Sequence, residues 1–347
     1  MSAELLADLR ATTRSALNSG SFDVVDELDL AGLLVDADRG GLGMGESEMI
    51  LVATELGRAL SPSSFLPNVV LAVTLLAHAE TDAATKILAA VAEGRSRCAV
   101  AVAEVDAPWL PPQPAVAATQ RSDGGWLLSG TVWGLSTPTA PDTVLVVAGA
   151  DGEAALFAAA TRDADVTHAD ELDPSRRLVR IALGDAAAQR LSDGDGTGAI
   201  AEAYRRGLLA VGAEQAGVAR NCLEEAVAYA KSRSQFGSPI GSFQAIKHRC
   251  AEVLLDVELA DAVIEQAIQT GAAADAELAF VVATRAALSA AESSIHIHGG
   301  IGFTWEHRAH RYLRRARVNA TLLGPMTFHR DAVAASAGLT TAEGDAK

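Results

Sequence analysis

Long stretches with apolar residues at helical spacing dominate the C-terminal part of the chain and predict long helices. The first stretch also places small residues along one face, which allows neighbouring helices to approach closely. The pair Gly299-Gly300 is expected to end the third stretch. The four stretches are 199–234, 242–271, 275–300 and 306–324. They predict a C-terminal four-helix bundle within residues 197–340.

Two regions precede the predicted bundle and differ in pattern. Residues 1–95 carry helical spacing, and the stretch that begins at Glu46 has acids where a helix dipole favours them. Residues 96–190 contain short β-type runs separated by Pro, Gly, Asp and Thr. These runs are CAVAVAEV, GWLLSGTVWGL, DTVLVVAGA, AALFAAA and RLVRIAL. We therefore expect an α+β chain with an N-terminal helical domain at 1–95, a small antiparallel β-domain at 96–190 and the C-terminal bundle.

Composition argues against several classes of partner. The formal net charge is -16, so neither nucleic acid nor an anionic membrane surface is expected as the main partner. The three cysteines, Cys98, Cys222 and Cys250, lack metal-ligand spacing, and we expect no metal site and no disulfide framework. The N-terminus lacks the features of a signal peptide, and charges interrupt each apolar run before it could span a bilayer. These features predict a soluble cytoplasmic protein.

The stretch RSQFGSPIGSFQ places an arginine, Arg233, at the predicted end of a long helix. An arginine there can cap the last helix carbonyls, or it can bind a phosphate group through two hydrogen bonds. An ordinary helix cap, with Phe236 filling the core, is the simpler interpretation of this motif by itself. Both interpretations stay open at this point.

The stretch IHIHGGIGF carries three glycines, Gly299, Gly300 and Gly302, whose backbone N–H groups could face an anion. It is not a dinucleotide-binding fingerprint, because it follows a predicted helix rather than a strand. A tight helix–helix turn is the alternative. His296 and His298 point in different directions on a helix, so no metal pair is expected.

Basic residues concentrate in the stretch HRAHRYLRRAR. We expect a solvated face or a face between subunits, because the net charge of the chain argues against nucleic acid. The arginines of this stretch are Arg308, Arg311, Arg314, Arg315 and Arg317.

Taken together, the order of the three regions and the spacing of RSQFG, a later glutamine and GGIGFTWE resemble the acyl-CoA dehydrogenase family over nearly the whole chain. The stretches LVDADRGGLGMGESEMILVATELGRAL and LLSGTVWGLSTPTAPDTVLVVA are similar to that family's N-terminal helices and β-domain strands, with Trp133 at the usual tryptophan. The resemblance implies a flavoenzyme that oxidises an acyl-CoA thioester to the 2-enoyl-CoA. A carboxylate removes the α-proton, the β-hydride goes to the flavin, and an electron-transfer flavoprotein accepts the electrons.

The resemblance also implies which residues bind FAD. In this family one FAD lies across a subunit interface, and the neighbouring bundle holds its diphosphate and adenosine. The positions that match are Arg233, Phe236, Gln244, Gly299, Gly300 and Gly302, with His296 where a glutamine is common.

The chemical half of the site departs from the family pattern. The usual T-E-P strand with its Gly-Ser-Asp loop is replaced by AEVDAPWLPPQ, in which Ala103 replaces a hydroxyl residue and Glu104 is retained. Gly134-Leu135 follows Trp133 where Ile-Thr is common. The two usual positions of the catalytic base align with Leu323 and Gly207, and neither can accept a proton.

Three hypotheses follow. The chain resembles the shorter, base-lacking subunit of heteromeric family members, notably those of bacterial steroid side-chain catabolism, in which a longer homologous subunit supplies the base and the flavin pocket. Such an assembly would be a heterotetramer. Alternatively, the chain is a self-sufficient homo-oligomer with a displaced base at Glu214, two helical turns beyond Gly207. A polar contact in the bundle is the simpler role for Glu214. The third hypothesis is a binder without redox chemistry on the same fold.

Overall fold

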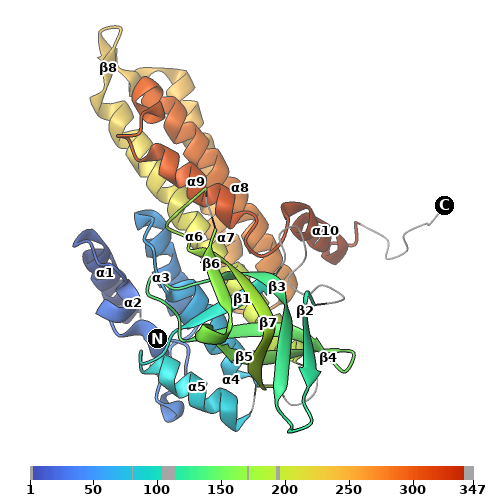
Figure 1. Ribbon diagram of the computed structural model, residues 1–347. Helices are drawn as coiled ribbons and strands as arrows, with labels where there is room; N and C mark the ends of the chain where they lie inside the picture. Colours follow the sequence, from blue (N-terminus) through green and yellow to red (C-terminus); the bar gives the residue numbers. More distant parts are fainter. Residues whose placement is uncertain (1–2, 80, 104–113, 170–171, 193–195, 340–347) are drawn as a thin grey trace, which may run out of the picture.

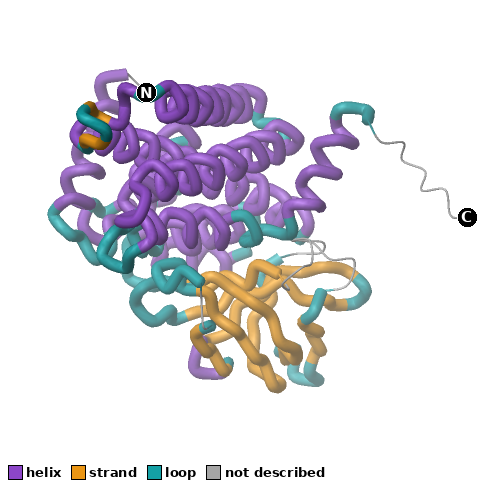
Figure 2. The backbone as a smooth tube through the Cα atoms, turned by 90° about the horizontal axis from the view of Figure 1, so that it is seen from above, coloured by secondary structure: helices purple, strands orange, loops and turns teal. Residues whose placement is uncertain are grey.

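The structure is a computed structural model, and it describes residues 3–79, 81–103, 114–169, 172–192 and 196–339. Helices come first along the chain, then a β-sheet, then long helices again (Figure 1). The strands of the seven-stranded sheet lie together on one side of the helices, and a separate two-stranded pair lies among the helices (Figure 2). This order of helix, sheet and helix confirms the predicted fold class.

The N-terminal helices begin where local signals predict them. The helix α3 (Glu46–Ala59) begins with the Gly45 N–H donating to the Glu48 carboxylate at 2.7 Å. A threonine, Thr81, caps the helix α5 (Asp82–Ala92). The remaining helical elements are α1 (Ala3–Asn18), α2 (Val24–Glu27), the short turns η1 (Leu30–Gly32) and η2 (Ala37–Arg39), and the buried segment η3 (Phe65–Ala72), which continues into α4 (Val73–Ala77).

Seven strands among the described residues form one sheet, and its pairing corrects the predicted antiparallel domain. Strand β4 runs parallel to both β1 and β2, whereas the other pairs are antiparallel. The pairs β1–β3, β3–β7, β7–β5, β5–β4 and β4–β1 close into a barrel. The strands are β1 (Cys98–Ala103), β2 (Val116–Gln120), β3 (Trp126–Leu135), β4 (Thr143–Ala150), β5 (Glu153–Ala160), β6 (Asp165–His168) and β7 (Leu178–Arg190), with the turn η4 (Thr161–Asp163) after β5.

The described part of the C-terminal bundle contains three long helices and two short ones. They are α6 (Thr197–Ser232), α7 (Gln244–Thr270), α8 (Ala273–His298), α9 (Ala309–Asn319) and α10 (Met326–Ser336). The fourth predicted helix is therefore shorter than expected, because α9 ends at Asn319 and a turn carries Leu323 toward Pro325. Helix α10, which the sequence pattern did not single out, is anchored by buried His329, which bonds the Glu277 carboxylate at 2.7 Å.

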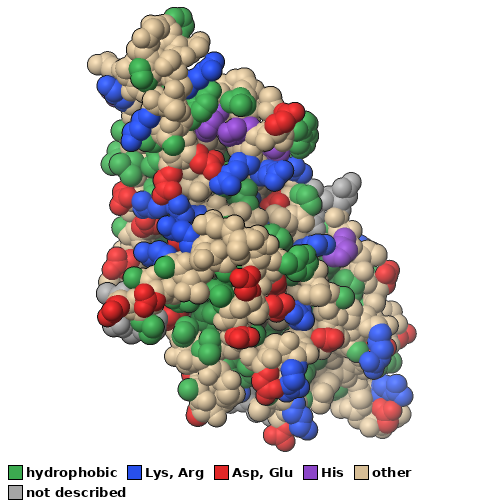
Figure 3. Space-filling view, turned by 90° about the vertical axis from the view of Figure 1, so that its left-hand side faces the viewer, with side chains coloured by type: hydrophobic (Ala, Val, Ile, Leu, Met, Phe, Trp, Pro, Cys, Tyr) green, Lys and Arg blue, Asp and Glu red, His purple; other side chains and the backbone are tan. Residues whose placement is uncertain are grey.

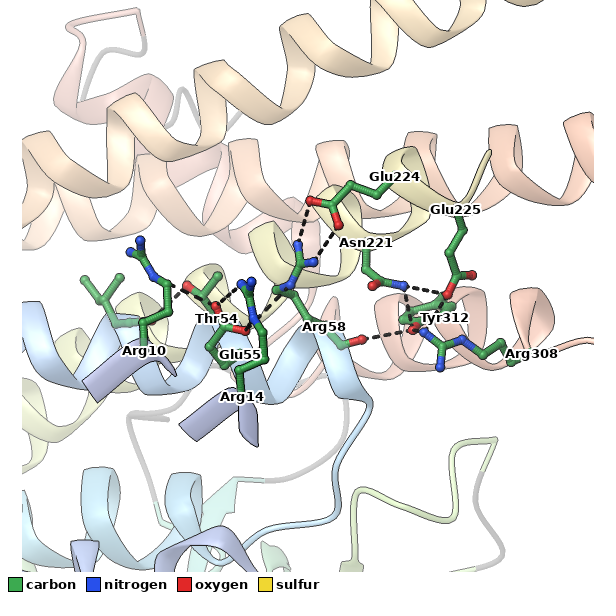
Figure 4. Close-up of polar contacts among 11 residues, drawn as sticks. Arg10, Arg14, Thr54, Glu55, Arg58, Asn221, Glu224, Glu225, Arg308 and Tyr312 are labelled. Carbon is green, nitrogen blue, oxygen red and sulfur yellow. Dashed lines mark hydrogen bonds and ion pairs between the residues drawn. The ribbon is translucent and has the colours of Figure 1, made fainter. Parts of the chain in front are cut away.

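Two glycines allow an N-terminal helix, α3, to pack closely against α6 of the bundle. A Cβ on Gly57 of α3 would lie 2.0 Å from the carbonyl oxygen of Glu214, and a Cβ on Gly217 of α6 would lie 2.0 Å from that of Thr54. The backbones of the two helices are therefore in contact, which only glycine permits. At the end of α3 the Tyr312 hydroxyl donates to the Arg58 carbonyl at 2.9 Å (Figure 4).

One segment, Ala273–Phe303, is long and apolar enough to span a membrane, with a mean hydropathy of 1.3. This differs from the expectation that charges interrupt every such run. The segment contains α8, which packs against α6, α7 and α9, and its alanines form part of the main hydrophobic core. Its apolar composition is thus explained by burial inside the bundle.

Candidate functional site

The turn after α6 presents the predicted diphosphate-binding residues at the tip of the bundle, at the end far from the sheet (Figure 1). Arg233 follows the last helical residue, and its N–H donates to the Tyr229 carbonyl at 2.8 Å. A two-strand hairpin, β8 (Ser234–Gln235) and β9 (Ser238–Pro239), then turns the chain through Phe236, whose φ is +52°. The Phe236 side chain is 93% exposed, so it does not fill the core.

The glycine turn after α8 forms a second exposed backbone segment, η6 (Gly299–Phe303). A Cβ on Gly299 or on Gly300 would meet no atom within 4 Å, so both residues open their backbone to solvent. Gly302 differs, because its Cβ would lie 2.7 Å from the Ile295 carbonyl oxygen. This third glycine allows the turn to fold back against the helix that precedes it.

The two histidines before this turn point in different directions, as predicted. His296 is exposed, whereas His298 is buried and its Nδ1 lies 2.7 Å from the Ser294 carbonyl oxygen. Within the described ranges no group of three His, Cys, Asp or Glu side chains could hold a metal ion.

A small apolar cluster brings the two exposed turns together. Ile297 packs with Ala230 near the end of α6, and Ile240 and Ile246 from either side of the start of α7 pack against the same cluster. Residues that lie far apart in the sequence, from Arg233 and Gln244 to the glycine turn, therefore share one end of the bundle. Exposed apolar side chains lie on the turns at this end, namely Phe236, Phe243, Ile301 and Phe303.

The two expected base positions lie in contact inside the protein. A Cβ on Gly207 would lie 3.3 Å from Leu323 Cδ1 and 3.1 Å from Leu71 Cδ2. Leu323 and Leu71 are fully buried, and Gly207 is buried on α6. Neither base position carries a group that can accept a proton.

The fallback base, Glu214, is held in a buried ion-pair cluster. Its Oε2 accepts from Arg176 at 2.5 Å, and its Oε1 accepts from Arg315. Burial opposes ionisation of this carboxyl, but the guanidinium groups of Arg176 and Arg315 outweigh it and hold the pKa of Glu214 below its ordinary value. Both oxygens are thus occupied and the pKa is low, which makes the carboxylate a poor base.

The cluster around Glu214 also connects the β-domain to the bundle. Arg315 of α9 pairs with Asp173, and its Nη2 donates to the Ser175 hydroxyl at 2.5 Å. The prediction that the arginines of this stretch form a solvated face is therefore wrong for Arg315, whose side chain is 1% exposed. The spacing of residues along α9 could not predict that Asp173 and Ser175 contact Arg315, because both residues come from the segment before β7, far away in the sequence.

Little open space adjoins Glu214. The cavity beside it, lined by Phe65, Leu66, Ala210 and Arg176 among others, has a volume of about 20 Å³. That volume is close to what a single water molecule requires. A substrate acyl group does not fit next to this carboxylate.

Comparison with known proteins identifies the fold and its family. Residues 5–95 match the family model described as acyl-CoA dehydrogenase, N-terminal domain, and residues 194–338 match acyl-CoA dehydrogenase, C-terminal domain. The chain belongs to the acyl-CoA dehydrogenase family. This family is a class of FAD-dependent oxidoreductases, so the cofactor and enzyme class expected from the sequence are confirmed.

Relatives and solved structures agree with this assignment. The acyl-CoA dehydrogenase IpdE2 of Mycobacterium tuberculosis is 32% identical over 298 residues, which cover 86% of this chain and 80% of that protein. A chain of the ChsE4-ChsE5 complex from Mycobacterium tuberculosis is 26% identical with a TM-score of 0.82, covering 99% of each chain. A chain of the Tcur3481-Tcur3483 steroid acyl-CoA dehydrogenase G363A variant has a TM-score of 0.85 at 24% identity, covering 96% of this chain and 99% of that chain.

The tip of this acyl-CoA dehydrogenase fits the diphosphate end of FAD. Arg233 forms no ion pair with any residue in the described part of the chain, so its guanidinium is available to an anion. The open backbone at Gly299 and Gly300 suits close approach of a phosphate or ribose. Gln244 is the first residue of α7 and lies two residues before Ile246, which packs against the apolar cluster at this end of the bundle.

The positions predicted to face the flavin include residues on two neighbouring strands, β1 and β3. Ala103 ends β1 and pairs with Trp133 across the sheet. Glu104 and the rest of the altered loop, 105–113, lie outside the described residues. A Cβ on Gly134 would lie 2.7 Å from the Val100 carbonyl oxygen, so strand packing accounts for the glycine at this position.

Proposed function

We propose that this chain is the base-lacking subunit of a heteromeric acyl-CoA dehydrogenase. Its bundle tip holds the diphosphate and adenosine of an FAD, and a longer homologous subunit supplies the flavin pocket and the catalytic base. The observation that carries the proposal is the contact between Leu323 and Gly207. Both base positions are apolar and packed together, while the diphosphate-binding tip of the same chain stays exposed.

Each residue at the tip has a distinct role in this proposal. Arg233 binds the diphosphate through its guanidinium, and the N–H groups near Gly299 and Gly300 donate to the same end of the ligand. Phe236 covers the adenosine, and Gln244 and His296 orient it. Bound FAD supplies the acceptor for the hydride that leaves the substrate β-carbon.

Two features favour a partner over a self-sufficient enzyme. Glu214 is occupied by two guanidinium groups and has no room for a substrate beside it. The tip exposes Phe236 and Phe303, which a second subunit would cover. Solved neighbours that are named as two-component complexes support the same arrangement.

The substrate is proposed from a solved neighbour, and the electron acceptor is proposed from the family. One neighbour is named as a steroid acyl-CoA dehydrogenase, and we extend this to a steroid side-chain CoA thioester as the substrate of the assembly. The assembly would be a heterotetramer. An electron-transfer flavoprotein would reoxidise the flavin.

The visible absorption spectrum tests the proposal. The chain is purified alone, and then after co-expression with the product of the neighbouring gene. We expect a colourless protein alone and a yellow, co-purified complex that an acyl-CoA bleaches. A yellow chain that is bleached without a partner would establish a self-sufficient enzyme, and absence of flavin from every co-expressed complex would establish a binder without redox chemistry.

A further inference from the structure

A groove separate from the proposed FAD tip lies between the end of α3 and the start of α9. Its volume is about 370 Å³, within the range of small-ligand sites. One part of the groove wall is apolar and contains Leu60 and Pro174. The other part is aromatic and charged, and contains Trp305, Arg308, Arg311 and Arg314. None of the residues assigned to the FAD tip lines it, so an inference about it does not rest on the proposed function.

An unusually exposed tryptophan stands at the mouth of this groove. Trp305 is 76% exposed, although its position is well defined by two neighbours. The Arg314 guanidinium carbon lies 5.9 Å from the ring centroid, and the His310 ring meets it edge-on at 4.9 Å. A large aromatic surface that is both fixed and exposed is suited to stacking on a flat ligand.

The charges around the groove favour an anion. Arg311 forms no hydrogen bond or ion pair through its side chain with the described residues. Arg308 is held against the wall, where it donates to the Tyr312 hydroxyl at 2.6 Å and pairs with Glu225 (Figure 4). The carboxylate that lines the groove, Asp173, is already neutralised by an arginine of the buried cluster.

This basic character is local. The whole chain carries a net charge of -16, yet Lys and Arg side chains gather beside a group of histidines on the helical half of the molecule (Figure 3). Guanidinium groups bind phosphate oxygens through paired hydrogen bonds. The groove therefore combines an aromatic stacking surface with phosphate-binding groups.

We propose that this groove binds a nucleoside diphosphate. The base stacks on the open face of Trp305, and Arg311 and Arg308 bind the phosphates. A free nucleotide and the nucleotide end of a larger cofactor share this chemistry, and ADP serves as the probe for both. The groove has room for one such ligand, whereas an extended acidic peptide would need a longer surface.

The test titrates the full-length chain with ADP and measures binding by equilibrium dialysis and tryptophan fluorescence. We expect saturable binding with quenching. Trp305→Ala removes the quenching, and Arg311→Gln weakens ADP binding about tenfold, as expected for loss of one charge-assisted contact. Arg317→Gln is the matched control, because Arg317 lies on the same helix, pairs with Glu292 and does not line the groove.

Two further arms, the variant Arg233→Ala and inorganic pyrophosphate, separate this site from the alternatives. The FAD tip is itself proposed to hold a diphosphate and an adenosine, so Arg233→Ala is used to remove that second site. ADP binding at the groove is expected to persist in Arg233→Ala, because Arg233 does not line the groove. Loss of ADP binding in Arg233→Ala, with retention in Trp305→Ala and Arg311→Gln, would place the ligand at the FAD tip and overturn the proposal. Inorganic pyrophosphate that binds as tightly as ADP would overturn the stacking role of Trp305, and absence of ADP binding by the unaltered chain would overturn the site.

Discussion

Leu323 packs directly against Gly207, and a Cβ on that glycine would lie 3.3 Å from Leu323 Cδ1. These are the two positions at which members of the acyl-CoA dehydrogenase family are expected to carry their base. The structure shows that the two positions are neighbours in space and that Leu71 closes the same contact. A single apolar contact therefore occupies both places from which a carboxylate could reach a substrate.

Restoring a carboxylate by Leu323→Glu is expected to create no dehydrogenase activity in the co-expressed complex. The new carboxyl would be buried against Leu71 and Gly207 without a charged partner, and its burial would cost about 3 kcal/mol of unfolding free energy. The altered strand at Ala103 would also remain. Acyl-CoA-dependent bleaching and urea unfolding measure the two effects.

Leu323→Met serves as the control for this substitution, because a volume-conserving apolar change costs less than about 1.5 kcal/mol. Robust turnover by Leu323→Glu would show that the flavin side of this chain is intact, and would contradict the proposed division of labour.

The variant Arg233→Ala is expected to lose FAD from the complex while the two subunits stay associated. The Arg233 guanidinium forms no ion pair with the described residues, so its removal is expected to weaken FAD binding without destabilising the fold. Flavin content per protein and elution volume on size exclusion are measured together. Lys231→Ala removes the same charge two residues earlier and should retain FAD. An unchanged flavin ratio in Arg233→Ala would rule out the assigned role.

Glu214→Gln is expected to destabilise the chain by about 3–5 kcal/mol, because Arg176 and Arg315 would be left buried without their carboxylate. Urea unfolding of the isolated chain measures this. Glu292→Gln, which removes an exposed partner of Arg317, should cost less than about 1 kcal/mol. A stable Glu214→Gln protein that has lost only its turnover would instead support the displaced-base hypothesis.

The lowered pKa of Glu214 predicts how the unfolding free energy depends on pH. The folded-state pKa of Glu214 lies below its ordinary value, so its contribution is present above the unfolded-state pKa. This contribution is lost as the pH falls through the folded-state pKa. Unfolding free energy should therefore decline on acidification below the ordinary carboxyl range, and less steeply in Glu214→Gln. Parallel declines in both proteins would assign the effect to other groups.

Gly217→Ala is expected to separate α3 from α6 and to lower stability by about 3 kcal/mol, because the added Cβ would lie 2.0 Å from the Thr54 carbonyl oxygen. Gly198→Ala is the matched control on the same helix, since its Cβ would meet no atom within 4 Å. It should be neutral or stabilising by up to about 1 kcal/mol. Thermal unfolding compares the two, and equal midpoints would contradict the close helix contact.

Much of the fold follows from local pattern. Helical spacing and the stop at Gly299 predicted α8, and apolar runs between turn residues predicted β1, β3, β4, β5 and β7. The strands β2 and β6 and the parallel pairs of β4 were not predicted. Strand pairing depends on partners that lie far apart in the sequence, so the hydrophobic pattern of a single segment does not predict which strands pair or in which direction.

For the candidate site as well, some features follow from the sequence and others only from the tertiary structure. The sequence by itself determined that Leu323 and Gly207 carry no carboxylate, because residue identity is a local property. Its resemblance to the family predicted the residues of the proposed diphosphate-binding tip. Only the tertiary structure decided that these two residues touch, and that Arg315 is buried rather than solvated. Burial of a charge requires partners, and those of Arg315 come from Asp173 and Glu214, which only the packing of the β-domain on the bundle brings together.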